Sequence, residues 1–229
     1  MLVIVANRQD DSAAWLATRW QAHDAVVLTP ADLSCIGWRY YVPDSGKSRA
    51  VIGGREVSMG EINGVVTRMP AVFERELGHI VPADRPYVAA EMSAFLLAWL
   101  SSLNCVMLNR PTPNCLSGPN WNCEQWIHLA ARLGIPVGPV HLGTALGLKE
   151  PSASGCDVIV VGNQCFGAAA PPLFDHARAL AAAAGTGLLA VKFTGPEADG
   201  ELVSAGLWPD VSSPAVADAM LNYLLRSAC

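Results

Sequence analysis

The chain is poor in charged residues for its length. Only 15% of its 229 residues are Asp, Glu, Lys or Arg, and the formal net charge is -5. An acidic balance without a local cluster of Lys and Arg does not suit a phosphate backbone, so we expect no nucleic-acid partner. Disorder is not expected either, because hydrophobic residues make up 52% of the chain and recur throughout it. One or two folded domains fit this composition.

Long apolar runs are also missing. No uninterrupted run reaches the roughly 20 residues that a membrane helix needs, and the longest candidate, 92–103, contains serines. The run at 2–6 is too short for the core of a signal peptide and has no basic flank. We therefore expect a soluble, cytoplasmic protein that does not enter a membrane.

The sequence has none of the common metal-binding or phosphate-binding signatures. Seven cysteines cannot all pair, no Cys-x-x-Cys occurs, and Cys115, Cys123 and His128 have no spacing typical of zinc. Neither G-x-x-x-x-G-K-[ST] nor G-x-G-x-x-G is present. A cysteine could still meet His79, His128 or His141 in space as a nucleophile pair, although lone histidines usually have no such role. We expect no metal site and no phosphate loop.

The sequence does contain an alternation of strand and helix patterns. The apolar runs 2–6 and 25–28 predict strands, with a helix between them that Asp11 or Ser12 would cap. A Gly53-Gly54 turn predicts a hairpin, and residues 84–103 predict the longest helix. Other strands are expected at 38–42, 49–52, 55–58, 62–69 and 105–108. The apolar stripe of the long helix would contain Tyr87, Met92, Phe95, Leu96, Trp99 and Leu103.

A segment rich in proline and glycine at 111–119 predicts the boundary between two domains, 1–113 and 114–229. Beyond it we expect a helix that starts at Asn120 and ends at Gly134. The remaining expected elements are a connection at 135–155, a hairpin at 157–168, a helix at 173–184, strands at 188–194 and 201–204, and a last helix opened by Ser213 and Pro214.

In this order the segments resemble the ATP-grasp superfamily, especially its RimK-like and peptide-maturing branch. The resemblance rests on 64–70, 91–100, 106–111, 125–136, 158–162, 186–193 and 208–210. It implies an α/β fold, with a pre-ATP-grasp-like (Rossmann-like) N-terminal domain followed by a reduced ATP-grasp-like α+β unit.

The departures from the family pattern concern the residues that hold ATP and magnesium. Asn122 stands where members commonly place a lysine near the phosphates, and a neutral amide supplies no point charge. Ser204 and Gly206 stand where the family carries its magnesium ligands Glu and Asn, and these residues offer little to a hard cation. Lys192 replaces an acidic residue and would repel a metal ion.

A further departure is one of length. Family members insert a lobe that closes over the nucleotide between the Ile-Pro turn and the hairpin strand. Only residues 137–156 separate these points here, whereas an independent lobe needs on the order of 50 residues. The resemblance therefore predicts a truncated protein that lacks the nucleotide clamp.

Two arginines are candidates for ligand binding. Arg68 and Arg110 each lie at the end of a predicted strand and are followed within two residues by proline, and Asn109 precedes the second of them. Open α/β sheets bind ligands at the carboxyl ends of their strands. A structural ion pair is the alternative role for each arginine; as ligand residues, they would bind an acidic group.

The resulting hypothesis is a non-catalytic, ATP-grasp-like scaffold that binds a protein partner, a peptide or a small molecule in a biosynthetic pathway. It would need no cofactor. One alternative is an atypical carboxylate–amine ligase that uses MgATP with help from a partner subunit, and another is a small-ligand sensor. A homodimer would cover the apolar surface that the missing lobe leaves bare.

Overall fold

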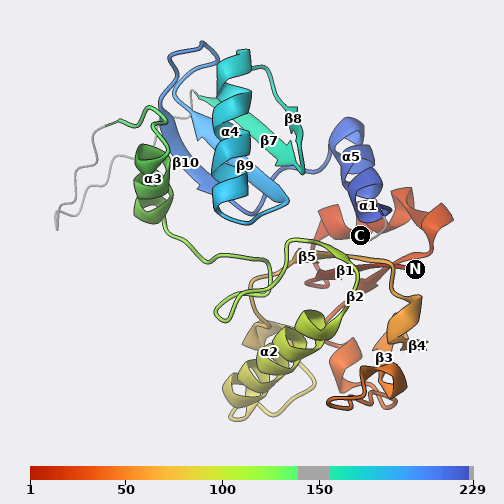
Figure 1. Ribbon diagram of the computed structural model, residues 1–229. Coiled ribbons are helices and arrows are strands. Elements are labelled where there is room, and N and C mark those ends of the chain that lie inside the picture. The colour runs from red at the N-terminus through yellow and green to blue at the C-terminus, as the bar shows by residue number, and fades with distance from the viewer. Residues whose placement is uncertain (139–154, 227–229) are drawn as a thin grey trace. The chain divides into compact units, whose positions relative to one another are not determined.

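The computed structural model describes residues 1–138 and 155–226 (Figure 1). They form two compact units, one whose described residues are 1–120 with 217–226, and one whose described residues are 121–138 with 155–216. The predicted connection at 135–155 lies mostly outside the described residues. No helix in the described part of the chain is both long and apolar enough to cross a membrane.

The first unit is built on a parallel sheet. Its strands are β1 (Leu2–Ala6), β2 (Ala25–Leu28), β5 (Gly64–Arg68) and β6 (Val106–Leu108), in the order β2-β1-β5-β6. All three neighbouring pairs are parallel. Every residue of β1 and β5 is buried, as expected for apolar strands covered on both faces. Because the strands run in one direction, their carboxyl ends share one edge of the sheet.

Helices cover both faces of this sheet. Figure 1 shows α2 (Arg85–Ser102) on one side and α1 (Asp11–Arg19) on the other. The last helix, α5 (Pro214–Leu224), belongs to this unit from Ala217 onward. The side chains of Arg19 and Asp218 join α1 to α5, with Nη2 and Oδ1 2.8 Å apart.

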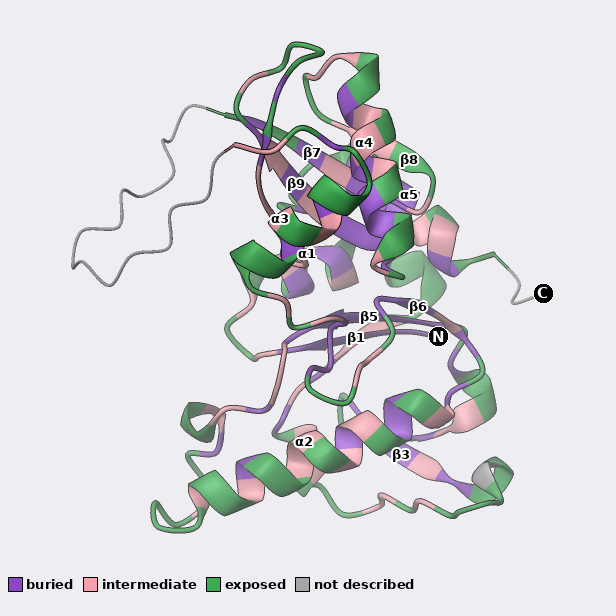
Figure 2. Cartoon of the chain, turned by 60° about the vertical axis from the view of Figure 1, so that its left-hand side comes forward, coloured by how far each residue is buried: buried purple, intermediate pink, exposed green. Residues whose placement is uncertain are grey.

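The main core of the first unit lies between α2 and the sheet. It includes Val3, Val65, Leu96, Trp99 and Leu100. One side of α2 is buried and the opposite side is exposed (Figure 2). The helix and much of its apolar stripe are therefore confirmed. Tyr87 was wrongly placed in the core, since it is 70% exposed in the first turn of the helix, ahead of the residues that reach the sheet.

A small hairpin completes the first unit. Strands β3 (Arg49–Ile52) and β4 (Arg55–Ser58) are antiparallel, and both turn glycines have positive φ, which confirms the predicted Gly-Gly turn. The strand predicted at 38–42 is reduced to a single bridge between Arg39 and Arg49. This segment packs its aromatic rings on α2 instead, with the Trp38 and Trp99 rings 5.5 Å apart. Short 3-10 turns occur at Gln21–His23, Asp32–Ser34, Ser45–Lys47, Met59–Glu61 and Glu74–Glu76.

The second unit is an antiparallel sheet with two helices. Strands β7 (Cys156–Val161), β8 (Gln164–Phe166), β9 (Leu188–Phe193) and β10 (Leu202–Gly206) lie in the order β10-β9-β7-β8. Helix α4 (Pro171–Ala183) packs on β7 and β9, and α3 (Cys123–Arg132) packs on β10. A parallel α/β unit and a smaller antiparallel α+β unit together confirm the predicted α/β fold class.

Candidate functional site

The carboxyl edge of the parallel sheet holds an ion pair that is mostly shielded from solvent. Arg68, the last residue of β5, donates from Nε to Oδ2 of Asp10 over 2.8 Å and from Nη2 to Oδ1 over 3.4 Å. The two side chains are 10% and 14% exposed. Asp10 also caps α1, where its Oδ1 accepts a hydrogen bond of 3.0 Å from the backbone N–H of Ala13. Sequence reasoning placed the cap at Asp11 or Ser12 and missed Asp10, the residue that positions Arg68.

The other two predicted ligand residues lie at the same edge. Asn109 and Arg110 directly follow β6, whose Leu108 pairs with Val66 of β5. Asn109 is only 3% exposed, whereas Arg110 is exposed and its Nη2 donates to the backbone carbonyl of Cys105 over 2.9 Å. The parallel register places the backbone of Arg68, Asn109 and Arg110 at one edge of the sheet, whereas the Arg110 guanidinium reaches back to Cys105, the residue before β6.

Two buried oxygen atoms at this edge have no hydrogen-bond partner. They are Oδ1 of Asn7, which directly follows β1, and Oγ1 of Thr67, the residue before Arg68. Thr67 is 4% exposed and pairs in register with Val5 of β1. Asn7 and Thr67 both follow apolar residues, and nothing in the sequence around them indicated a functional role. This edge of the sheet therefore contains an ion pair, in which Asp10 balances the charge of Arg68, and two oxygen atoms without a hydrogen-bond partner.

In the second unit, polar residues gather on the face of the sheet opposite α4. Val158, Val191 and Phe193 are fully buried in the core under the helices. Because side chains alternate along a strand, Lys192 projects from the other face. There it pairs in register with Asp157 of β7 and Ser204 of β10. Lys192 is half-buried and lies near the end of β9, which is one of the two central strands of this sheet.

A glycine makes room for the Lys192 side chain. A Cβ atom at Gly155 would lie 2.9 Å from Cε of Lys192 and 2.6 Å from the carbonyl oxygen of Phe193. Any larger residue at position 155 would therefore displace the lysine stem or the backbone of β9. The predicted pair Ser204 and Gly206 is close by, since Gly206 pairs with Ala190 on the same face.

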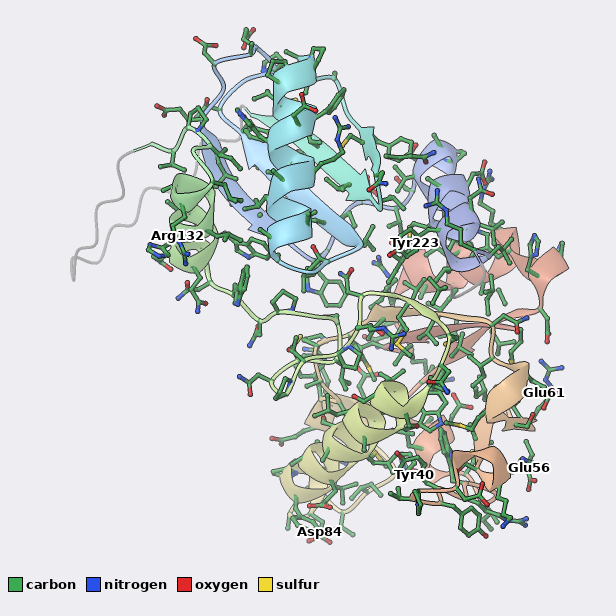
Figure 3. All side chains as sticks on the ribbon, in the orientation of Figure 1. Tyr40, Glu56, Glu61, Asp84, Arg132 and Tyr223 are labelled. Atoms are coloured by element: carbon green, nitrogen blue, oxygen red, sulfur yellow. The ribbon has the colours of Figure 1, made fainter. Side chains whose placement is uncertain are left out.

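Asn122 caps the start of α3. Its Oδ1 accepts from the backbone N–H of Gln125, and its own N–H donates to Oε1 of Gln125, both over 2.9 Å. The predicted cap at Asn120 is therefore wrong by two residues, because this reciprocal pair satisfies two helix N–H groups at once. A surface groove of about 550 Å³ is lined by residues in and beside this helix that include Trp121, His128 and Arg132. Figure 3 labels Arg132, the last residue of the helix.

The cysteine and histidine candidates are dispersed. Cys115 Sγ lies 3.3 Å from Ser117 Oγ, and Cys123 Sγ donates to the carbonyl of Val203. Within residues 1–138 and 155–226, no group of three His, Cys, Asp or Glu side chains could hold a metal ion. His79 Nε2 lies 2.7 Å from Ser34 Oγ in an exposed contact, and position 141 is outside the described residues.

Comparison with known proteins shows which solved structures have a fold similar to that of this chain. No protein-family model and no curated protein matches the sequence. The macrocyclase MdnC from Microcystis aeruginosa MRC, solved with its precursor peptide MdnA, has a TM-score of 0.69 and 12% identity over 99% of this chain and 100% of its own. A RiPP-associated ATP-grasp ligase from Chryseobacterium gregarium, solved with ADP and a leader and core peptide, has a TM-score of 0.68 and 8% identity over 97% and 96%.

An ATP-grasp RimK domain protein from Sphaerobacter thermophilus has a TM-score of 0.53 and 14% identity over 98% of this chain and 99% of its own. Identities this low show a shared fold. The chain therefore has an ATP-grasp-like fold, similar to those of peptide-maturing ligases and of a RimK-type protein.

Proposed function

We propose that this protein is a non-catalytic binding subunit that holds an acidic group of a peptide or small metabolite for a partner enzyme. The observation that carries the proposal is the position of Lys192 on the sheet face opposite α4, next to Asp157 and Ser204. A fixed ammonium group there repels a divalent cation and attracts a carboxylate. Ser204 beside it can donate a hydrogen bond to the same anion.

A peptide is the ligand class we favour. MdnC was solved with its precursor peptide, and the Chryseobacterium ligase with a leader and core peptide. A protein with this fold could keep a peptide-binding role without the residues that hold MgATP. Under this proposal the chain is a truncated pseudoenzyme that needs no cofactor, and a homodimer is the expected arrangement if apolar surface is left uncovered.

The carboxyl edge of the first unit supplies the second set of proposed ligand residues. Arg110 is exposed there, and Arg68 is held in a fixed orientation by Asp10. We propose that Arg110 and Asn109 contact the ligand, while the charge of Arg68 is largely balanced by its carboxylate partner. Replacing Arg110 with Gln should weaken ligand binding while leaving the ion pair of Arg68 intact.

Calorimetry with the isolated chain tests the proposal. A glutamate-rich peptide should bind, and Lys192→Ala should weaken it by about tenfold, since a hydrogen bond to a charged group contributes ~1.5 kcal/mol. Lys47→Ala is the matched control, because Lys47 is an exposed lysine paired with Asp44 in the first unit. MgATP should give no binding heat. Tight, magnesium-dependent ATP binding would overturn the proposal.

One observation favours a second function, that of an ATP-dependent carboxylate–amine ligase completed by a partner subunit. The similarity to ligases extends over nearly the full length of both chains. This alternative predicts that MgATP binds only after the partner is added. A titration of the mixed complex with ATP, with and without magnesium, separates it from the binding-subunit proposal.

A further inference from the structure

The exposed side of α3 forms a groove that the proposed function does not use. Trp121, His128 and Arg132 line it and follow one another at intervals of seven and four residues, so they lie on one side of the helix. Trp126 and Ala130, on the other side of α3, are buried in the core of the second unit. The groove has a volume of about 550 Å³ and belongs entirely to the second unit.

The groove has an apolar part. Trp121 is half-buried, and its ring lies edge-on to the ring of Trp126 with the centroids 4.8 Å apart, so a core residue holds its orientation. Leu129 is also half-buried and lines the groove further along α3. A fixed aromatic ring and an aliphatic side chain, both partly exposed in a concave surface, are suited to bind an apolar side chain of a ligand.

The two ends of the groove carry opposite charges. Glu124 lies in the first turn of α3 and Arg132 in its last turn, and both line the groove. Both side chains are exposed, and neither forms an ion pair with another residue in the ranges 1–138 and 155–226. These charges suit the helix dipole, so the same two residues stabilise α3 and give the groove a negative and a positive end.

An extended peptide matches the spacing of these charges. Glu124 and Arg132 are eight positions apart, which corresponds to about 12 Å along a helix. Residues of an extended chain rise by about 3.3 Å and alternate between two faces, so the first, third and fifth residues share a face and span about 13 Å. A basic first residue would reach Glu124 while an acidic fifth residue reaches Arg132, and an apolar third residue would lie between them. A ligand with charges of one sign only would be repelled at one end of the groove.

We propose that the α3 groove docks an extended peptide segment with the pattern basic-x-apolar-x-acidic, in either chain direction. The inference rests on the proposed function for the class of its ligand, a peptide, and it names the sequence that the second unit selects. It uses none of the residues proposed above to bind an acidic group. The two proposals can therefore fail separately.

Two capped pentapeptides test the charge pattern in NMR titrations of the full chain. Acetyl-Lys-Thr-Leu-Thr-Glu-amide should shift the signals of Trp121 and Leu129, and acetyl-Lys-Thr-Leu-Thr-Lys-amide should bind about fivefold more weakly, the effect of an exposed ion pair. Arg132→Glu should reverse this preference, because it repels the acidic end of the first peptide and attracts the second lysine of the other. A reversed preference also shows that the variant is folded. Arg75→Glu is the matched control, because Arg75 is a 71% exposed arginine of the first unit, and it should keep the original preference.

Four outcomes would overturn the docking site. The first is the absence of any shift at Trp121 and Leu129 with both peptides. The second is equal affinity of the unmodified protein for the two peptides, and the third is an unchanged preference in Arg132→Glu. The fourth is a shift of the Trp121 signals on dilution of the free protein, which would assign the groove to a second copy of the chain. None of these outcomes alters the result of Lys192→Ala with the glutamate-rich peptide, which tests the proposed function.

Discussion

The two sheets of this protein gather polar residues in different ways. In the first unit, parallel strands bring residues that follow separate strands to one edge, where Arg68 meets Asp10. In the second unit, antiparallel strands separate the side chains onto two faces, and Lys192 stands on the face opposite the helices. The first arrangement neutralises a buried charge with a partner. The second places a half-buried lysine beside Asp157 and Ser204.

Two ion pairs of the first unit, one mostly buried and one more exposed, should differ strongly in their effect on stability. Asp10→Ala would leave Arg68 without its carboxylate in a mostly buried position and would remove the cap of α1. We expect a loss of about 3–5 kcal/mol in the free energy of unfolding, measured by urea denaturation. Asp218→Ala, which breaks the more exposed pair with Arg19, should cost less than about 1 kcal/mol. Equal losses in both variants would contradict the distinction.

Two adjacent residues of β9 lie on opposite faces of the second sheet, and their replacement should affect stability differently. Phe193 is fully buried under the helices, so Phe193→Ala should destabilise the protein by about 3–5 kcal/mol. Lys192→Ala should change stability by no more than about 0.5 kcal/mol, because it removes no core contact. Thermal denaturation of both variants measures this difference. A large loss for Lys192→Ala would assign the lysine a structural role.

The cap of α3 tests whether Asn122 acts in structure. Asn122→Ala should cost about 0.5–2 kcal/mol, because the first turn of the helix loses its side-chain acceptor. Asn122→Asp keeps an acceptor oxygen and should retain most of the stability. Urea denaturation of the two variants provides the measurement. If alanine and aspartate behave alike, the capping contact does not contribute.

The smallest expected effect concerns the turn Met59–Glu61 in the first unit. The hydroxyl and the backbone N–H of Ser58 both donate to Oε2 of Glu61, and these bonds lower the pKa of Glu61 below its usual 4.5. A lowered pKa means that the contribution is complete above the usual value and is lost as the pH falls through the lowered one. Glu61→Gln should therefore lower the stability slightly at pH 7, where the contribution of the carboxylate is complete, and should change it little at a pH below the lowered pKa, where that contribution is already lost. An equal effect at both pH values would contradict this assignment.

Most elements could be predicted because their signals are local. The apolar runs of β1 and β5, the Gly53-Gly54 turn and the start of α5 at Pro214 each depend on a few neighbouring residues. Helix caps were harder. Asp10, Asp11 and Ser12 are all good capping residues, and only the contact with Arg68 distinguishes the first of them.

The candidate site was predictable only in part. The positions of Arg68, Asn109 and Arg110 after strands were readable from the sequence, but the contact of the Arg110 guanidinium with the Cys105 carbonyl was not. The unpaired oxygens of Asn7 and Thr67 left no trace in the sequence, because an unsatisfied atom is defined by its surroundings. Tyr87 was misplaced for a related reason, since helical periodicity does not say where along a helix its partner sheet ends.

The sequence by itself determined the strands, the helices and the absence of common phosphate and zinc motifs, because each depends on residues close together in the chain. Tertiary structure alone decided that α5 returns to the first unit, that Asp10 neutralises Arg68 and that Lys192 stands between Asp157 and Ser204. These pairings join residues tens to hundreds of positions apart, and only the register of the strands and the packing of the helices specify such contacts.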